Sequence, residues 1–305
     1  MTRYDRIWNN AIKDAVFYRR NPHLFARDYL HLNLKLFQRM LLILMNYYFI
    51  FMFVAARGLG KSFLTAIFCV IRCILWPGTK IIIASGTKGQ SISVLEKVQL
   101  ELVPRSNELK AEIDWKQTNI NGNKAIIVFK NGSFMKVVSA TDNARSNRAN
   151  LLLVDEFRMV KKTTIDKVLR KFLTQKRMPA YSELTDEERK KLQARELNKT
   201  IYLSSAFYAD HWSYQKCIDT FKSMFDPRRK NFICGFPYQL GLKEGVLDKD
   251  EIVEEMLESD FNEVDFSIKF SVLIKPIEPV SSGVWDQRIV IVGNDGLMIL
   301  LTGEP

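Results

Sequence analysis

The chain contains one short glycine-bearing stretch, AARGLGKS at residues 55–62, between the apolar run FIFMFV and the run SFLTAIFCVIRCIL. Gly60, Lys61 and Ser62 match the end of the pattern G-x-x-x-x-G-K-[ST], whose first glycine is replaced here by Ala55. Between a strand and a helix, such a loop surrounds phosphate oxygens with backbone N–H groups at the helix N-terminus. The stretch therefore predicts a phosphate-binding loop, and the alternative is a chance G-K-S in a turn.

A second motif, LLLVDEF at residues 151–157, is an apolar run that ends in two acids. Asp155 follows Lys61 by 155 − 61 = 94 residues, which leaves room for further strands between the motifs. In phosphate-loop ATPases the lysine reaches the β and γ phosphates, and the next hydroxyl, here Ser62, ligates Mg²⁺. Asp155 would hold the metal, directly or through water, and Glu156 would polarise the attacking water as general base. The two motifs together predict a site for ATP and Mg²⁺.

Short apolar runs alternate with helix-like stretches along most of the chain. Such runs are typical of parallel strands covered on both faces, so the alternation predicts a three-layer α/β domain with a mostly parallel central sheet. An inserted β-hairpin is expected within residues 125–140, because Asn131-Gly132 supplies the positive φ angles of a tight turn. The expected strands are 49–54, 80–85, 151–154 and 200–205, and the expected helices are 5–20, 36–46, 61–75, 90–103, 186–196 and 248–260.

The pattern becomes more irregular after residue 207, and Pro276 and Pro279 mark a linker. The core is expected to be a P-loop NTPase of the additional-strand, catalytic-glutamate type, with a small helical subdomain after it. The expected regions are an N-terminal helical segment at 1–35, the ATPase core at 36–206, a small lid or linker subdomain at 207–275, and a linker with a terminal hairpin at 276–305.

The balance of charges narrows the classes of partner. Among 305 residues, Lys and Arg exceed Asp and Glu by 45 − 34 = 11, which favours a polyanionic partner, nucleic acid first, over a merely basic protein. The four cysteines form no C-x-x-C pair and are expected to be buried thiols of a reducing compartment. The most apolar stretch, residues 40–56, is shorter than the ~20 residues of a spanning helix, so we expect a soluble cytoplasmic protein and no membrane partner.

The two motifs, with an arginine inside the loop and D-E closing the acidic strand, resemble the ATPase domain of the large terminase subunit of tailed bacteriophages. The resemblance covers roughly residues 30–275. It implies that Arg57 senses or stabilises the γ-phosphate and that Gln38, in LNLKLFQRML, contacts adenine. The loop residues expected to bind the triphosphate are Arg57, Gly58, Leu59, Gly60, Lys61 and Ser62.

Two further stretches match the same family. In YLSSAF, the residues Ser204, Ser205 and Ala206 resemble the coupling motif that links hydrolysis to domain movement. Upstream of the acidic strand, either Arg145 or Arg148 would act on the nucleotide of a neighbouring subunit, since arginine suits a finger that reaches across an interface. Each match has a plainer alternative: an exposed helical Gln38, serines that only end a strand, and surface arginines.

The resemblance implies a DNA-packaging motor that uses ATP and Mg²⁺ to translocate double-stranded viral DNA into a procapsid. The implied partners are double-stranded DNA, the portal protein, the small terminase subunit and further copies in a ring, in the cytoplasm of a bacterial host. After Pro279 only 305 − 279 = 26 residues remain, too few for a ribonuclease-H-like nuclease, so we expect ATPase without nuclease activity. Two alternatives stay open: a helicase-like nucleic-acid ATPase, and a nucleotide-gated module that binds DNA or portal with little turnover alone.

Overall fold

The computed structural model describes residues 3–86, 88–120, 125–140, 147–177, 187, 196, 198–208, 210–263, 266, 269, 288–292 and 298–302. Within this part of the chain, a seven-stranded sheet has the order β3-β4-β2-β5-β6-β1-β7. Its strands are β1 Ile50–Ala55, β2 Lys80–Ser85, β3 Ile126–Val128, β4 Phe134–Ser139, β5 Leu151–Val154, β6 Lys199–Ser204 and β7 Asn231–Phe236. All neighbours pair in parallel except β3 and β4. The expected mostly parallel α/β sheet is confirmed.

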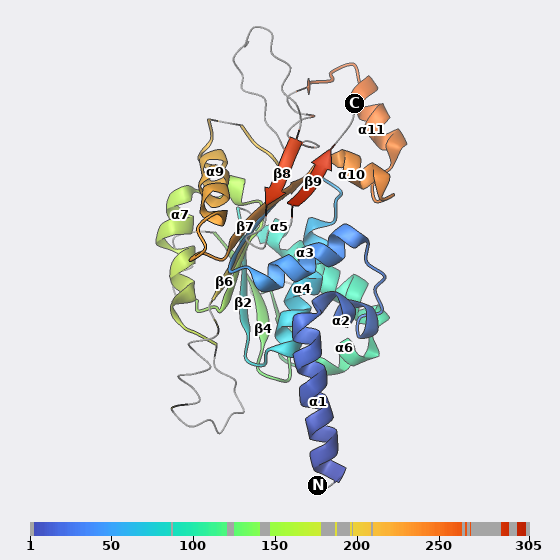
Figure 1. Ribbon diagram of the computed structural model, residues 1–305, viewed down its shortest axis with the longest axis vertical. Coiled ribbons are helices and arrows are strands. Elements are labelled where there is room, and N and C mark those ends of the chain that lie inside the picture. The colour runs from blue at the N-terminus through green and yellow to red at the C-terminus, as the bar shows by residue number, and fades with distance from the viewer. Residues whose placement is uncertain are drawn as a thin grey trace.

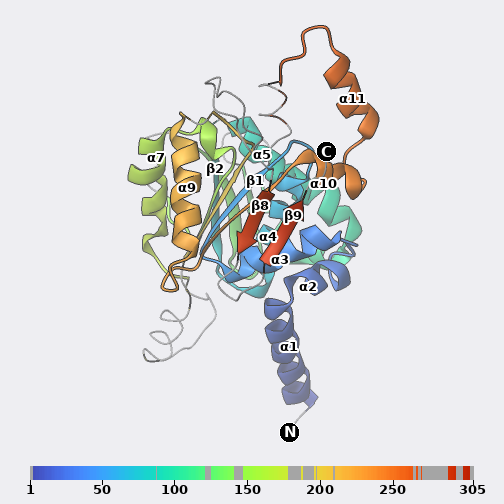
Figure 2. The ribbon, with the colours of Figure 1, turned by 45° about the horizontal axis from the view of Figure 1, so that its top comes forward.

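Helices cover both faces of this sheet (Figures 1 and 2). On one face lie α3, α4 and α5, and on the other lie α7 and α9. The α-helices of the described residues are α1 Arg3–Arg20, α2 Pro22–Asp28, α3 Leu36–Tyr47, α4 Lys61–Leu75, α5 Lys88–Lys97, α6 Asn107–Glu112, α7 Lys162–Lys167, α9 Trp212–Met224, α10 Tyr238–Lys243 and α11 Lys249–Leu257. Shorter π and 3-10 turns lie at Val98–Leu102, Val103–Arg105, Phe157–Met159 and Leu169–Thr174.

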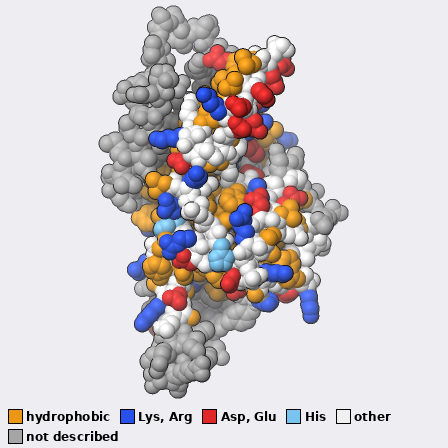
Figure 3. Space-filling model, turned by 90° about the vertical axis from the view of Figure 1, so that its right-hand side faces the viewer, with side chains coloured by type: hydrophobic (Ala, Val, Ile, Leu, Met, Phe, Trp, Pro, Cys, Tyr) orange, Lys and Arg blue, Asp and Glu red, His pale blue; other side chains and the backbone are white. Residues whose placement is uncertain are grey.

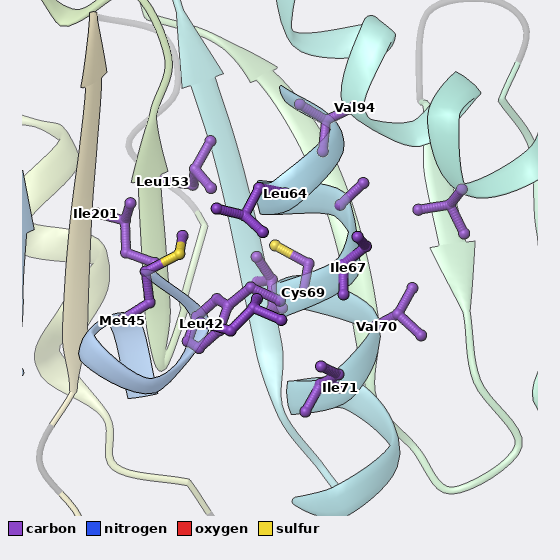
Figure 4. Close-up of a cluster of buried hydrophobic side chains, with 14 of the residues drawn as sticks. Leu42, Met45, Leu64, Ile67, Cys69, Val70, Ile71, Val94, Leu153 and Ile201 are labelled. Atoms are coloured by element: carbon purple, nitrogen blue, oxygen red, sulfur yellow. The ribbon is translucent and has the colours of Figure 1, made fainter. Parts of the chain in front are cut away.

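The alternation of side chains along each strand builds two hydrophobic cores. Phe51 and Phe53 of β1 face α3 and α4, whereas Met52 and Val54 face the side of α7 and α9. Figure 4 shows the first core, where Leu42 of α3 and Leu64 of α4 pack toward Leu153 and Ile201 of the sheet. Each such fully buried side chain contributes roughly 1.5–3 kcal/mol. The two cores fix the sheet between its helices and so hold the strand ends in place.

The expected hairpin is present, and it extends the sheet. β3 pairs antiparallel with β4, and Gly132 between them has φ of 80°. The Asn131 side-chain amide also donates to the carbonyl of Cys73 at 2.8 Å, which ties the turn to the end of α4. β4 in turn pairs in parallel with β2, so the hairpin is not a separate insertion but supplies two strands of the central sheet.

The sheet also extends past residue 206, where we expected the core to end. β7 pairs in parallel with β1 over its whole length, and α9 packs against it. The expected helix at 248–260 is present as α11, whereas nearly all of 186–196 lies outside the described residues. β8 Arg288–Val292 and β9 Met298–Thr302 pair antiparallel, as expected for a terminal hairpin. None of the described helices combines the length and apolar character needed to cross a bilayer.

Candidate functional site

Three adjacent strands bring the sequence motifs together at one edge of the sheet. β1 leads into the glycine loop, β5 leads into Asp155 and Glu156, and β6 leads into Ser205. β6 lies between β5 and β1, and all three strands are parallel. Their carboxyl ends therefore meet, and the segment after β6 lies between the loop and the acidic pair.

The glycine loop has a conformation that requires glycine at two positions. Gly58 has φ of 78° and Gly60 has φ of 71°, both in the left-handed region that a Cβ disfavours. Gly60 is the N-cap of α4, which begins at Lys61 and runs for 15 residues. The loop thus delivers the chain directly to a helix N-terminus, whose dipole and unpaired N–H groups favour an anion.

Lys61 lies folded back along the loop. Its Nζ donates to the carbonyls of Ala55 at 2.7 Å and Ala56 at 3.0 Å, and to Ser205 Oγ at 3.4 Å. Burial lowers the pKa of Lys61 to about 8, an effect that the nearby Glu156 and Asp155 oppose. Lys61 therefore links the loop to the end of β6, and its neighbour Ser62 lies in the first turn of α4.

Asp155 is a buried carboxyl at the tip of β5. Its Oδ1 accepts the backbone N–H of Glu156 at 3.0 Å. Burial, and then the adjacent Glu156, raise the pKa of Asp155 to about 6. A cation beside a buried carboxylate reverses such a shift, and carboxylate and hydroxyl oxygens are ligands that Mg²⁺ accepts. Asp155 therefore suits a divalent cation, for which Ser62 would supply a second oxygen.

Glu156 is held by two donors on one oxygen. Its backbone lies in the left-handed region with φ of 43°. Oε2 accepts a hydrogen bond from Arg158 Nε at 3.0 Å and another from Ser204 Oγ at 3.4 Å. Arg158 Nη1 also donates to the carbonyl of Ala206 at 2.8 Å. Arg158 was not among the site residues expected from the sequence, where its one signal is a basic residue two positions after the acidic pair.

The segment Ser204–Ala206, at the end of β6, contacts Lys61, Glu156 and Arg158. Ser204 donates to Glu156, Ser205 accepts from Lys61, and the Ala206 carbonyl accepts from Arg158. All three residues are buried. Ser204–Ala206 is therefore not only the end of a strand, because it lies in contact with the loop lysine, the acidic motif and Arg158 at once.

Gln38 and Arg57 lie beside the loop in different ways. Gln38 is only 9% exposed, so it is not a solvated helical residue. Its Oε1 accepts the N–H of Lys35 at the start of α3, and a Cβ on Gly60 would lie 3.9 Å from its Nε2. Arg57 is exposed. The structure thus places Gln38 next to the loop, as the expected adenine contact requires.

Of the two candidate finger arginines, Arg148 alone lies among the described residues. Arg145 lies outside the described residues. Arg148 is exposed, donates to the carbonyl of Asn147 at 3.1 Å, and precedes the first residue of β5. Because β5 runs toward the site, Arg148 lies at the opposite end of that strand from Asp155.

Residues of the expected lid cover the glycine loop. A Cβ on Gly58 would lie 2.3 Å from Leu247 Cδ2, and one on Gly241 would lie 2.6 Å from Leu247 Cδ1. The N–H of Arg57 donates to the carbonyl of Lys269 at 2.9 Å. The adjoining α11 exposes acidic and apolar side chains (Figure 3). Leu247 and the Lys269 carbonyl therefore contact the loop, and Leu247 also packs on Gly241 of α10.

Comparisons with known proteins agree with this geometry. A family model for the terminase large subunit, T4-like-virus type, N-terminal, matches residues 52–193. The large terminase ATPase domain of Thermus phage P74-26 is similar at 13% identity and a TM-score of 0.58, over 81% of this chain and 96% of that domain. The large terminase of bacteriophage HK97 is similar at 13% identity and a TM-score of 0.56, over 88% of this chain and 63% of that protein. A search of curated proteins gave no match. The resemblance stated from the sequence is confirmed, and the fold is that of a large terminase ATPase domain.

Proposed function

We propose that this chain, a large-terminase ATPase domain by its family model and its fold, hydrolyses ATP to drive double-stranded viral DNA into a procapsid. One observation carries the proposal: Lys61, Glu156 and Ser204–Ala206 come from three different strand ends and are joined by hydrogen bonds. A chance G-K-S turn would have no reason to contact an acidic pair and a serine segment so far away in sequence.

The glycine loop and Gln38 would hold the nucleotide. Loop amides from Gly58, Leu59 and Gly60, together with the N-terminus of α4, would bind the phosphates. Lys61 would leave the loop carbonyls and reach the β and γ phosphates, with Arg57 near the γ-phosphate. Gln38, buried beside Gly60, would contact adenine.

Asp155 and Ser62 would hold Mg²⁺. The bound ion would supply positive charge that stabilises the developing charge on the phosphate oxygens. The raised pKa of Asp155, which the charge of Lys61 offsets only in part, supports this assignment, because a bound cation would stabilise the buried carboxylate. Glu156, the next residue, would orient a water and accept its proton.

Ser204–Ala206 would respond to the nucleotide state, because this segment contacts both Lys61 and Glu156. A neighbouring copy in a ring would supply Arg145 or Arg148. DNA would be gripped through its phosphates by Lys and Arg, consistent with the excess of 11 positive charges, so that binding would be salt-dependent and almost sequence-blind. The portal protein and the small terminase subunit would be the other partners, in the cytoplasm of the bacterial host.

The test is Mg²⁺-dependent ATP hydrolysis over a range of protein concentrations, for the wild type and Glu156→Gln. We expect hydrolysis that rises steeply with protein concentration, because an arginine in trans requires a neighbour. Glu156→Gln should bind nucleotide with similar affinity and lose at least about a hundredfold in kcat, since the amide accepts no proton.

Three other outcomes have distinct meanings. Nucleotide binding without turnover in both proteins, at every concentration, would favour a nucleotide-gated module that binds DNA or portal. Strand separation coupled to hydrolysis would favour a helicase-like ATPase. No nucleotide binding by the wild type would sink the proposal.

A further inference from the structure

We infer that Arg158 is a positioning residue that joins the Glu156 carboxylate to the Ala206 carbonyl, so that the general base and the segment after β6 move together. The inference rests on the proposed function for the role of Glu156. It concerns how the site is controlled, and it adds a residue that neither motif contains.

The guanidinium of Arg158 bridges two elements that are 48 residues apart in sequence. Nε donates to Glu156 Oε2 at 3.0 Å, and Nη1 donates to the Ala206 carbonyl at 2.8 Å. The guanidinium carbon Cζ also lies over the ring of Phe207, 5.0 Å from its centre. Because the guanidinium is a rigid, planar fork, a displacement of one acceptor is transmitted to the other.

The surroundings make this bridge tight. The Arg158 side chain is 9% exposed and the Glu156 side chain 19% exposed, so little water competes for these bonds. The backbone of Glu156 lies in the left-handed region, which a non-glycine residue keeps only where its neighbours hold it there. Phe157, between the two residues, is fully buried against Tyr202 and Trp212 and anchors the turn.

The bridge and Ser204 act on the same oxygen of Glu156. Ser204 and Arg158 both donate to Glu156 Oε2, and Ala206 lies two residues after Ser204. Ser205, between them, accepts from Lys61. When a γ-phosphate draws Lys61 away from Ser205, the segment loses one of its anchors, and Arg158 carries the resulting shift to the carboxylate that faces the water.

A matched control lies elsewhere in the same molecule. Arg177 is also buried and makes a similar bridge, with two bonds to the Glu196 carboxylate at 2.6 and 2.9 Å and one to the Pro77 carbonyl at 2.7 Å. Its hydrogen-bond partners, Glu196 and Pro77, do not belong to the site. If breaking any buried arginine bridge were enough to lower kcat, Arg177→Ala should therefore lower kcat as well.

The first measurement is hydrogen exchange of the nucleotide-free protein. Arg158→Ala should speed exchange in both 155–160 and 204–208, whereas Arg177→Ala should speed it only around its own contacts. Exchange at 204–208 that stays at the wild-type rate in Arg158→Ala would overturn the coupling, whether or not the protein hydrolyses ATP.

The second measurement is steady-state hydrolysis. Arg158→Ala should lower kcat at least about tenfold while the Kd for nucleotide changes less than about threefold. Arg158→Lys keeps the charge but lacks the planar fork that holds the two acceptors in fixed positions, so relative to Arg158→Ala it should raise the melting temperature more than it raises kcat. The double variant Arg158→Ala/Ser204→Ala should lose less than the product of the single losses, because both side chains act on one oxygen.

The outcomes separate the two proposals. A wild-type kcat in Arg158→Ala, or losses that multiply fully in the double variant, would overturn the positioning role while the ATPase stands. A wild type that binds no nucleotide would remove the proposed function, and the exchange measurement would still decide whether Arg158 couples the two segments.

Discussion

The two ends of the same sheet both carry buried charges, but the partners of those charges differ. At the amino ends of the strands, Lys199 Nζ donates to the carbonyls of Asn46 and Tyr48 at 2.8 and 2.7 Å. Nearby, the Arg72 guanidinium lies 3.9 Å from the centre of the Trp76 ring. These partners are backbone carbonyls and a core aromatic ring, which hold elements together in one arrangement.

At the carboxyl ends, the charged groups contact one another and short polar side chains. Lys61 reaches Ser205, and Glu156 accepts from Ser204 and Arg158. Burial lowers the pKa of Lys199 as it does that of Lys61, so a perturbed lysine by itself marks neither end as a site. The difference lies in the partners: at the carboxyl ends Lys61 and Glu156 both contact Ser204–Ala206, whereas at the amino ends Lys199 contacts backbone carbonyls and Arg177 pairs with Glu196 and the Pro77 carbonyl.

The sharpest test of this contrast is Lys61→Met. Nucleotide affinity should fall at least about a hundredfold, because the ammonium that meets the phosphates is gone. The melting temperature should change little. The carbonyls of Ala55 and Ala56 lose a donor, but Lys61 is only partly buried, so water can replace that donor, and the cost of holding an ammonium whose pKa burial lowers to about 8 is removed.

Calorimetric titration with nucleotide and a thermal melt of the same sample measure the two effects. Intact nucleotide binding together with a large fall in melting temperature would show that Lys61 is a structural lysine like Lys199, and the contrast between the two ends would be lost.

Lys199→Met should show the opposite pattern. Lys199 is 4% exposed, so its removal leaves the carbonyls of Asn46 and Tyr48 buried without their donor. Such a loss costs about 2 kcal/mol, which lowers the melting temperature by about 5 °C in a domain of this size. Nucleotide affinity of the folded protein should change less than about twofold. A loss of affinity comparable to that of Lys61→Met would contradict the assignment of this end to structure.

Features that a local sequence pattern encodes could be predicted, whereas features that depend on contacts between distant segments could not. The glycine loop and the helix that begins at Lys61 are local patterns, and residues 61–75 form that helix as expected. β7 was missed because its strand, NFICGF, includes a polar residue and a glycine and follows an irregular aromatic stretch. A short edge strand of this kind is defined by its pairing with β1, which no local pattern contains.

The candidate site divides in the same way. The motifs gave Lys61, Asp155 and Glu156, and the strand order explains why they meet. Arg158 could not be predicted, because the direction of its side chain depends on the left-handed backbone at Glu156 and on the distant Ala206 carbonyl. Contacts between side chains from different strands require the assembled sheet.

The smallest expected effect comes from Gly58→Ala, which tests how tightly Leu247 covers the glycine loop at the carboxyl ends of the strands. Gly58→Ala would strain the backbone at φ of 78° and bring a Cβ within 2.3 Å of Leu247 Cδ2. The Leu247 side chain already packs on Gly241 and so has little room to move away. We expect a loss of about 1 kcal/mol in unfolding free energy and nucleotide affinity weaker by about three- to tenfold.

Two further variants separate the causes of that loss. Gly89→Ala adds the same methyl group in α5, where nothing lies within 4 Å, and should be neutral or slightly stabilising. The double variant Gly58→Ala/Leu247→Ala removes the clash and keeps the backbone strain, so it should recover part of the affinity and little of the stability. If Gly58→Ala behaves like Gly89→Ala, Leu247 does not press on the loop in solution. The glycine loop at the carboxyl ends of the strands would then be covered less tightly in solution than these contacts indicate. The contrast with the closely packed amino ends would be larger.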